Sequence, residues 1–230
     1  MSAASVMVST SSSQDERRGP IPTAALQSIL VKPIPFVAAK SILVRNHYLH
    51  SMPGGTQLAF GVLQGNRLLG AITFGSGPAH AYRLVQGANP EDCMTLSRLW
   101  LSDELPSNSE SRVISIALRA LKKHTKTKFI VSYADPGQGH LGTIYQATGW
   151  IYTGLSEAMP MFDLGDGRVR HSRSLSHTLG SHSIKYLEEQ GIEVRVVPQT
   201  RKHRYIYFLD PSLKTQLTVN PQPYPKKETK

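Results

Sequence analysis

The most chemically capable side chains of this sequence gather between residues 131 and 150. The segment holds a serine, two phenols, a carboxylate, an amide and an imidazole around a glycine-rich turn, namely Ser132, Tyr133, Asp135, Gln138, His140 and Tyr145. Ser132 and Asp135 fall at the end of a predicted strand, where open α/β sheets bind their ligands. Such a set predicts general acid–base chemistry. A structural interpretation, in which Asp135 only caps the following helix, stays open.

A second polar cluster includes His47, Tyr48 and His50. On the helix predicted there, His47 and His50 are three residues apart and share one face. With Asp135, or with His140, they would suit an iron or zinc ion. Ordinary surface or helix-end histidines are the alternative, so the sequence alone leaves the metal open.

The spacing of apolar residues predicts the elements that position these clusters. We expect helices at 37–49, directly after 107–110, at 141–148 and at 183–190, and strands at 57–63, 67–74, 94–101, 129–133, 150–153, 192–197 and 204–209. Residues 107–110 predict a capping box. Alternation along 94–101 would place Leu96, Arg98 and Trp100 on one face of their strand. The order predicts an α/β fold, with a mixed central sheet flanked by helices in a single domain.

Length and composition limit the class of protein. The 230 residues are 40% hydrophobic, enough for one domain with a buried core, and the single cysteine, Cys93, excludes a disulfide framework. No apolar run approaches the roughly 20 residues of a membrane span, so we expect no membrane partner. We expect a disordered tail at 1–21, a folded domain at 22–210 and a basic, proline-rich tail at 211–230.

The chain is strongly basic, with 26 Lys and Arg against 16 Asp and Glu, a net charge of +10 and a pI near 9.8. Residues 46–164 carry only +1, whereas residues 1–45 carry +3 and residues 165–230 carry +6. A neutral centre with basic flanks favours a body that grips nucleic acid.

The predicted phosphate contacts lie in a loop and in a late strand, and they are Arg168, Arg170, Arg173, Arg201, Lys202 and Arg204. Tyrosines alternate with the last of these, as in a strand that stacks bases. A half-buried edge strand would show the same pattern, so both interpretations stay open.

Residues 144–154 resemble the helix-to-strand segment of the GNAT acyltransferases, where a tyrosine precedes a glycine and an aromatic residue. The run Ser-Tyr-Ala-Asp-Pro-Gly-Gln-Gly-His at 132–140, Asn-His-Tyr at 46–48 and Leu-Ser-Arg-Leu-Trp at 96–100 resemble the Mom family of phage DNA-modification proteins. The resemblance covers roughly residues 34–207. It implies a GNAT-like transferase in the host cytoplasm that converts adenine N6 of double-stranded DNA to the carbamoylmethyl form and so evades restriction.

The same resemblance implies roles for individual residues. The catalytic group would be Asp135, Tyr145, Ser132, His47 and Tyr48. Within it, Asp135 would accept a proton from the adenine amine, or orient His47, and Tyr145 would protonate the departing group. The adenine, flipped out of the duplex, would be bound by Arg98, Tyr133, Gln138 and His140.

The sequence also bears on the donor of the transferred group. GNAT enzymes hold coenzyme A on a glycine-rich loop, but residues 105–112 contain no glycine and place Glu110 where a phosphate would sit. Ser109, Ser111 and Arg112 could still hold a phosphate, so the loop disfavours acetyl-CoA but leaves it open as the donor. A carbamoylmethyl amine is an isomer of a glycyl amide. An activated glycine such as glycyl-tRNA is therefore our hypothesis, with tRNA as a second partner.

Two alternatives use the same residues. The chain could be a GNAT-like acyltransferase acting on a small amine or a protein, with basic flanks that have no part in its activity. It could also be a nucleic-acid-binding protein on a catalytically inactive acyltransferase scaffold.

Overall fold

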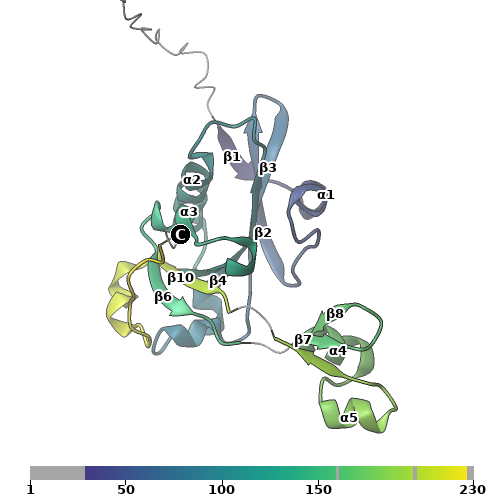
Figure 1. The fold of residues 1–230 in the computed structure, drawn as a ribbon. Coiled ribbons are helices and arrows are strands. Elements are labelled where there is room, and N and C mark those ends of the chain that lie inside the picture. Colours follow the sequence, from purple (N-terminus) through teal and green to yellow (C-terminus); the bar gives the residue numbers. More distant parts are fainter. Residues whose placement is uncertain (1–28, 159–160, 199–200, 227–230) are drawn as a thin grey trace, which may run out of the picture.

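The computed structural model describes residues 29–158, 161–198 and 201–226, and its main body is one seven-stranded sheet (Figure 1). The strand order is β1-β2-β3-β4-β5-β10-β6. The strands are β1 (Leu30–Pro33), β2 (Thr56–Gln64), β3 (Arg67–Gly75), β4 (Cys93–Leu101), β5 (Phe129–Ala134), β6 (Ile151–Leu155) and β10 (His203–Phe208). Neighbours pair antiparallel except β4 and β5, which are parallel. The predicted mixed α/β sheet is confirmed, whereas the tail predicted at 1–21 lies outside the described residues.

Helices cover both faces of the sheet (Figure 1). Helix α1 (Phe36–Asn46) packs Ala39 and Leu43 against alanines of β2 and β3. Helix α2 (Ser109–His124) buries its apolar side against the opposite face, through Val113, Ile114, Ala117, Leu118 and Leu121. The short helix α3 (Thr143–Gln146) lies beside α2 and contributes Tyr145 to the same core. The sheet therefore has an α1 face and an α2/α3 face.

A β-bulge in β4 overturns the predicted alternation of that strand. Leu96 pairs with Phe74, but Arg98 pairs with Thr73, so Ser97 is an extra residue on β4. An inserted residue reverses the faces of everything beyond it. Leu96 therefore packs in the α2-side core, whereas Trp100 packs under α1. The prediction that Leu96, Arg98 and Trp100 share one face was wrong.

Two predicted helix ends also differ from the structure. Helix α1 ends at Asn46, and His47 is already extended, so His47 and His50 do not share a helix face. The capping box at 107–110 is absent, because Asn108 adopts a left-handed conformation and makes no side-chain cap. Ser109 instead donates its hydroxyl proton to the carbonyl oxygen of Pro106.

A small lobe is inserted between β6 and β10 and extends away from the main sheet (Figure 1). It contains a second sheet in the order β8-β7-β9, and its elements are β7 (Met161–Asp163), β8 (Val169–His171), α4 (Ser172–Leu179), α5 (Ile184–Glu189) and β9 (Arg195–Val197). Phe162, Leu175 and Leu187 form its own core. The prediction of a loop around Arg168 and Arg173 was therefore wrong, because strand β8 and helix α4 form there.

The C-terminal segment is attached to the body as far as it is described. After the short 3-10 helix η5 (Pro211–Gln216), the prolines exclude a regular element, as expected. The backbone N–H of Gln222 nevertheless donates to the Tyr152 carbonyl, and the Tyr224 hydroxyl donates to the Trp150 carbonyl. Residues 211–226 thus brace the outer strand β6. No helix within the described ranges is long and apolar enough to cross a membrane.

The turn before α3 yields a test of the fold. Gly142 has φ +74°, and a Cβ there would lie 2.4 Å from the Tyr205 ring. We expect Gly142→Ala to lower the free energy of unfolding by about 2–4 kcal/mol, from backbone strain plus overpacking. Gly139 has a similar φ of +70° but open space around it, so Gly139→Ala should lose only about 1–2 kcal/mol. Urea unfolding measures both variants, and equal losses would contradict the packing argument.

Candidate active site

The candidate site lies where the parallel strands β4 and β5 part. Their pairing runs from Cys93 and Phe129 to Leu96 and Ser132, and it stops directly before the bulge at Ser97. Beyond that point β4 remains paired with β3, and β5 remains paired with β10. Arg98 on one strand and Asp135 after the other therefore flank an opening in the sheet. Backbone groups left unpaired at such an opening can bind a ligand.

Two hydroxyl groups meet at the base of this opening, on the α2/α3 face. Ser132 Oγ lies 2.8 Å from the Tyr145 hydroxyl oxygen and 3.0 Å from the Leu96 carbonyl oxygen. The carbonyl only accepts, so when Ser132 donates to it, the Tyr145 proton is directed at Ser132. Burial is the main cause that raises the pKa of Tyr145 to about 12. Tyr145 therefore keeps its proton at neutral pH, as a proton donor must.

His47 lies on the α1 face as a neutral ring with a defined tautomer. Burial is the main cause that lowers its pKa to about 4, and the charge of Arg98 lowers it further. The backbone N–H of Leu49 donates to Nδ1 at 3.2 Å, so the single ring proton of neutral His47 is on Nε2. His47 thus presents a hydrogen-bond donor at neutral pH. Its ring stacks on Tyr48 at a centroid distance of 4.4 Å.

Tyr48 lies in the field of two opposite charges. Burial raises the pKa of its phenol, the Asp135 carboxylate raises that pKa further, and Arg98 opposes both effects. The edge of the ring also meets His140 at a centroid distance of 5.5 Å. Tyr48 is nevertheless 40% exposed, so its ring is available to a flat ligand on this face.

Asp135 is held by one hydrogen bond and one ion pair. Its Oδ1 accepts the Gly137 N–H at 2.9 Å, so the cap that the structural interpretation requires is present. Its Oδ2 lies 3.5 Å from Lys202 Nζ, and the two side chains are only 18% and 31% exposed. This ion pair keeps a carboxylate at the rim of the opening and leaves lone pairs free to accept a proton.

The remaining predicted substrate residues divide between the site and the surface. Arg98 donates to the carbonyl oxygens of Ser51 and Ser97, which fixes its guanidinium beside His47. Tyr133 is largely buried, and burial raises its pKa to about 12. Gln138 and His140 are exposed on the turn after β5. The structure thus gathers His47, Tyr48, Arg98, Asp135 and His140 into one group, which we call the α1-face cluster.

The basic residues of the late strand have partners inside the protein. Arg201 donates to the carbonyl oxygens of Leu155 and Ser156, and Arg204 donates to Thr153. β10 lies between β5 and β6, so the alternative of an edge strand was wrong. Tyr205 on this strand is fully buried and has no face for a base. Phosphate contacts by these arginines stay a prediction.

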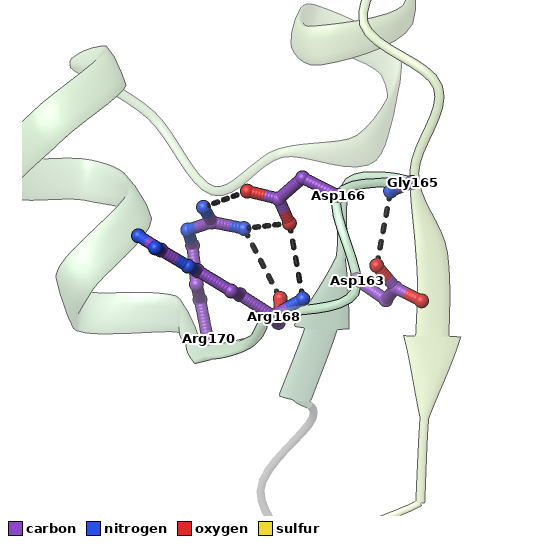
Figure 2. Close-up of polar contacts among 5 residues, drawn as sticks. All are labelled: Asp163, Gly165, Asp166, Arg168 and Arg170. Atoms are coloured by element: carbon purple, nitrogen blue, oxygen red, sulfur yellow. Dashed lines mark hydrogen bonds and ion pairs between the residues drawn. The ribbon is translucent and has the colours of Figure 1, made fainter.

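Figure 2 shows Arg168 and Arg170, two arginines of the inserted lobe. Arg170 forms a two-pronged ion pair with Asp166, which holds the pKa of that carboxyl well below its usual range. The Arg168 guanidinium points away from both carboxylates in the view, although its backbone N–H donates to Asp166. The side chain of Arg173 lies outside what the structure describes. Arg168 is therefore better placed than Arg170 to bind an added phosphate.

The structure also bears on the predicted cofactor residues. Ser111 donates its hydroxyl proton to the Asn108 carbonyl oxygen at 2.9 Å, so that proton is not directed at a ligand. Arg112 is exposed at the same end of α2, and Glu110 occupies the first turn. The start of α2 thus fits a coenzyme A phosphate poorly. Among the described residues, no three His, Cys, Asp or Glu side chains form a metal-binding group.

Sequence reasoning missed the ion pair between Lys202 and Asp135. The two residues are 67 positions apart and meet because β10 pairs with β5, His203 opposite Ala134. The basic run at 201–204 predicts contact with a polyanion, and only the register of β10 shows that Lys202 reaches a carboxylate. A prediction that residues 203–208 pair antiparallel with residues 129–134 would have indicated that Lys202 lies beside Asp135.

Fold and site together define an α/β protein with acid–base side chains at the point where two parallel strands part. The sequence profile of the Mom protein family matches residues 28–226, and the chain belongs to that family. It is 31% identical over 192 residues to the methylcarbamoylase Mom of Escherichia phage Mu, which covers 78% of this chain and 76% of that protein.

Solved structures with a similar arrangement of elements include acetyltransferases. NAA60 of Arabidopsis thaliana, solved with acetyl-CoA, has a TM-score of 0.49 and 10% identity, over 79% of this chain and 98% of that chain. The GNAT family N-acetyltransferase YhbS of Escherichia coli, solved with CoA, has a TM-score of 0.44 and 14% identity, over 84% of this chain and 87% of that chain.

The electrostatics of the α1-face cluster give a direct test. Because the positive charge of Arg98 helps to hold the pKa of His47 near 4, Arg98→Met should raise that pKa toward, but not to, its ordinary 6.5. Burial, the larger cause, remains. NMR titration of the His47 ring measures the midpoint, with Arg83→Met as a control on an exposed arginine. Because the pKa of His47 is lower in the folded protein than in the unfolded chain, the unfolded chain takes up a proton first. The free energy of unfolding should therefore decrease as the pH falls from about 6.5 to 4. An unmoved midpoint in Arg98→Met would contradict the proposed proximity.

Proposed function

We propose that this protein is a phage DNA-modifying transferase that converts adenine N6 to the carbamoylmethyl form and so protects DNA from restriction. Membership of the Mom family and the likeness to a methylcarbamoylase support the transfer of this group. The observation that most directly supports this proposal is the opening between β4 and β5. The carboxylate of Asp135 lies at its rim, and the protonated phenol of Tyr145 lies at its base. This pair supplies the base and the acid that acylation of an amine needs.

The adenine is proposed to enter on the α1 face. A base inside a duplex cannot reach such a site, so it must be flipped out and stacked. Tyr48 and His140 offer exposed rings for stacking, whereas Trp150 and Tyr152 are buried and do not. His47 Nε2–H and Arg98 supply donors for the acceptor nitrogens of the purine ring. Asp135 then accepts the proton that N6 loses as it forms its new bond.

The donor is proposed to be an activated glycine ester such as glycyl-tRNA. Adenine N6 attacks the ester carbonyl carbon, the new C–N bond forms, and the bond from that carbon to the ribose oxygen breaks. Asp135 takes the N6 proton and Tyr145 gives its proton to the departing ribose oxygen, so charges and atoms balance. The poor fit of the α2 start to coenzyme A phosphates favours this donor over acetyl-CoA.

An isomerisation completes the product. The glycyl amine of the acylated adenine attacks ring carbon C6 and closes a five-membered ring with N6. The bond from C6 to the original N6 then breaks, and that nitrogen becomes the terminal amide. No atom enters or leaves in this step, which is why a glycyl amide and a carbamoylmethyl amine have one composition.

Asp135→Ala tests the role of the carboxylate. We expect loss of adenine modification by at least about 100-fold, typical of a general base, with DNA affinity nearly unchanged. Mass analysis of nucleosides from DNA of expressing cells measures the product, and salt-dependent binding to duplex DNA measures affinity. Asp163→Ala is the matched control, because Asp163 also accepts a backbone N–H two residues on, from Gly165, but in the inserted lobe. Equal loss of modification and binding in a folded Asp135→Ala protein would reassign Asp135 to binding.

The same nucleoside analysis separates the alternatives. An unmodified adenine together with acylated small amines or proteins would favour an acyltransferase of that kind. No product with salt-sensitive DNA binding would favour an inactive scaffold that binds nucleic acid.

The donor has its own test. Purified protein, DNA and glycyl-tRNA labelled in the glycine should give labelled deoxyadenosine, whereas labelled acetyl-CoA should give none. Tyr145→Phe should reduce the label strongly while leaving the fold intact, since only one buried hydroxyl is removed. Label from acetyl-CoA but not from glycyl-tRNA would overturn the donor proposal.

A further inference from the structure

A basic groove lies on the α2/α3 face, away from the α1-face cluster. It has a volume of about 150 Å³, and Ser115, Arg119, Lys122, Thr148, Tyr207 and Leu209 are among its lining residues. A second hollow of about 270 Å³ shares Lys122 and Leu209 and continues past Thr127 and Asp210. We call the first hollow the α2 groove.

The charge of the α2 groove is open to a ligand. Within the described ranges of the chain, neither Arg119 nor Lys122 takes part in an ion pair. Asp210 is the acidic residue nearby, and its carboxylate accepts from the backbone N–H and the hydroxyl of Ser212. These hydrogen bonds lower the pKa of Asp210, and the charges of Lys128 and Lys122 lower it further, so Lys122 is in electrostatic reach of Asp210 without forming an ion pair. Arg119 and Lys122 are three residues apart on α2, about 4.5 Å along its axis. That spacing fits two neighbouring phosphates of one nucleic-acid strand, which follow each other at about 3.4 Å along the axis.

The position of the groove separates it from the proposed DNA-binding side. Leu118 and Tyr207 of the groove belong to the core between α2 and the sheet, whereas α1 packs on the other face. A duplex that presents an adenine beside Tyr48 therefore does not also lie in the α2 groove. The groove is nevertheless near Tyr145. Its Tyr207 ring contacts Trp150 at 5.6 Å, and Trp150 contacts Tyr145 at 5.0 Å, between centroids.

Two hydroxyl groups in the groove favour RNA over DNA. Ser115 donates its proton to the Ser111 carbonyl oxygen, and Thr148 donates to that of Ile144. Because both hydroxyl protons are directed at backbone carbonyls, the two oxygens are left to accept a hydrogen bond from a ligand. A ribose 2′-hydroxyl is a donor that DNA lacks, and it is the group by which proteins distinguish RNA.

We propose that the α2 groove binds the acceptor stem of the tRNA that carries the donor ester, with Arg119 and Lys122 contacting its phosphates. The stem then lies on the α2/α3 face, and its unpaired 3′ end reaches the opening at Tyr145 while the adenine enters from the α1 face. This assignment rests on the proposed function, because it requires a tRNA-borne donor.

Neighbouring lysines of α2 allow a matched test with the full chain. Lys122→Gln and Arg119→Gln should each weaken binding of purified tRNA several-fold and reduce the slope of log affinity against log salt by about 0.7–0.9. Lys123→Gln removes the same charge from the adjacent exposed position outside the groove, and it should change tRNA affinity much less. Duplex DNA affinity should stay unchanged in all three variants.

Each other outcome has a defined meaning. If Lys122→Gln binds tRNA as Lys123→Gln does, or loses DNA affinity instead, the assignment of the groove is overturned. Wild-type protein is assayed in parallel for modified adenine. Absence of that product overturns the proposed function whatever the tRNA result, whereas product with unchanged tRNA binding by the groove variants overturns only the groove.

Discussion

The parting of β4 and β5 is the constraint on which the rest of the site depends. One extra residue, Ser97, breaks the register of β4, and the parallel pairing with β5 ends at the residue before it. If the side chains alternated regularly from Leu96 onward, Arg98 would face the α2-side core, where a buried guanidinium has a high cost in free energy. With the bulge, Arg98 turns to the α1 face and meets the backbone after α1. A single insertion therefore both opens the sheet and places the cation beside His47.

The opening makes the site two-sided. Along β5 the side chains alternate, so Ser132 faces α3 and Tyr145, whereas Tyr133 lies on the other face with Val131. In the proposed reaction, the acid Tyr145 and the base Asp135 are thus supplied from opposite faces, at the edge where β5 ends. In that proposal, the separation lets the adenine and the donor ester approach the reacting carbon from different directions. Positioning by the sheet reduces the entropy that each partner loses in reaching that geometry.

Periodicity in the sequence predicted the helices and strands well, but it did not predict the β-bulge in β4 or the early end of α1. The hairpin at Gly65 and the buried side of α2 follow from turn chemistry and helical spacing, which are local properties. The bulge at Ser97 was not predictable, since a period of two carries no mark of an inserted residue. The early end of α1 at Asn46 was missed for a similar reason, because His47, Tyr48 and Leu49 are acceptable helix residues. In the structure His47 is extended and residues 48–49 form a turn, closed by the His50 N–H, which donates to the His47 carbonyl.

The segments that lead into and out of the inserted lobe are hydrogen-bonded to each other beside the candidate site. Ser156 and Lys202 exchange hydrogen bonds, since the Ser156 N–H donates to the Lys202 carbonyl and the Lys202 N–H donates to Ser156 Oγ. The side chain of this same Lys202 reaches Asp135. One residue, Lys202, therefore contacts both Ser156 and the Asp135 carboxylate. Because the ion pair is partly shielded from water, it is screened less by salt than an exposed pair would be. The segment that returns from the lobe thus does more than lead into β10, since its Lys202 is the cation paired with the Asp135 carboxylate of the candidate site.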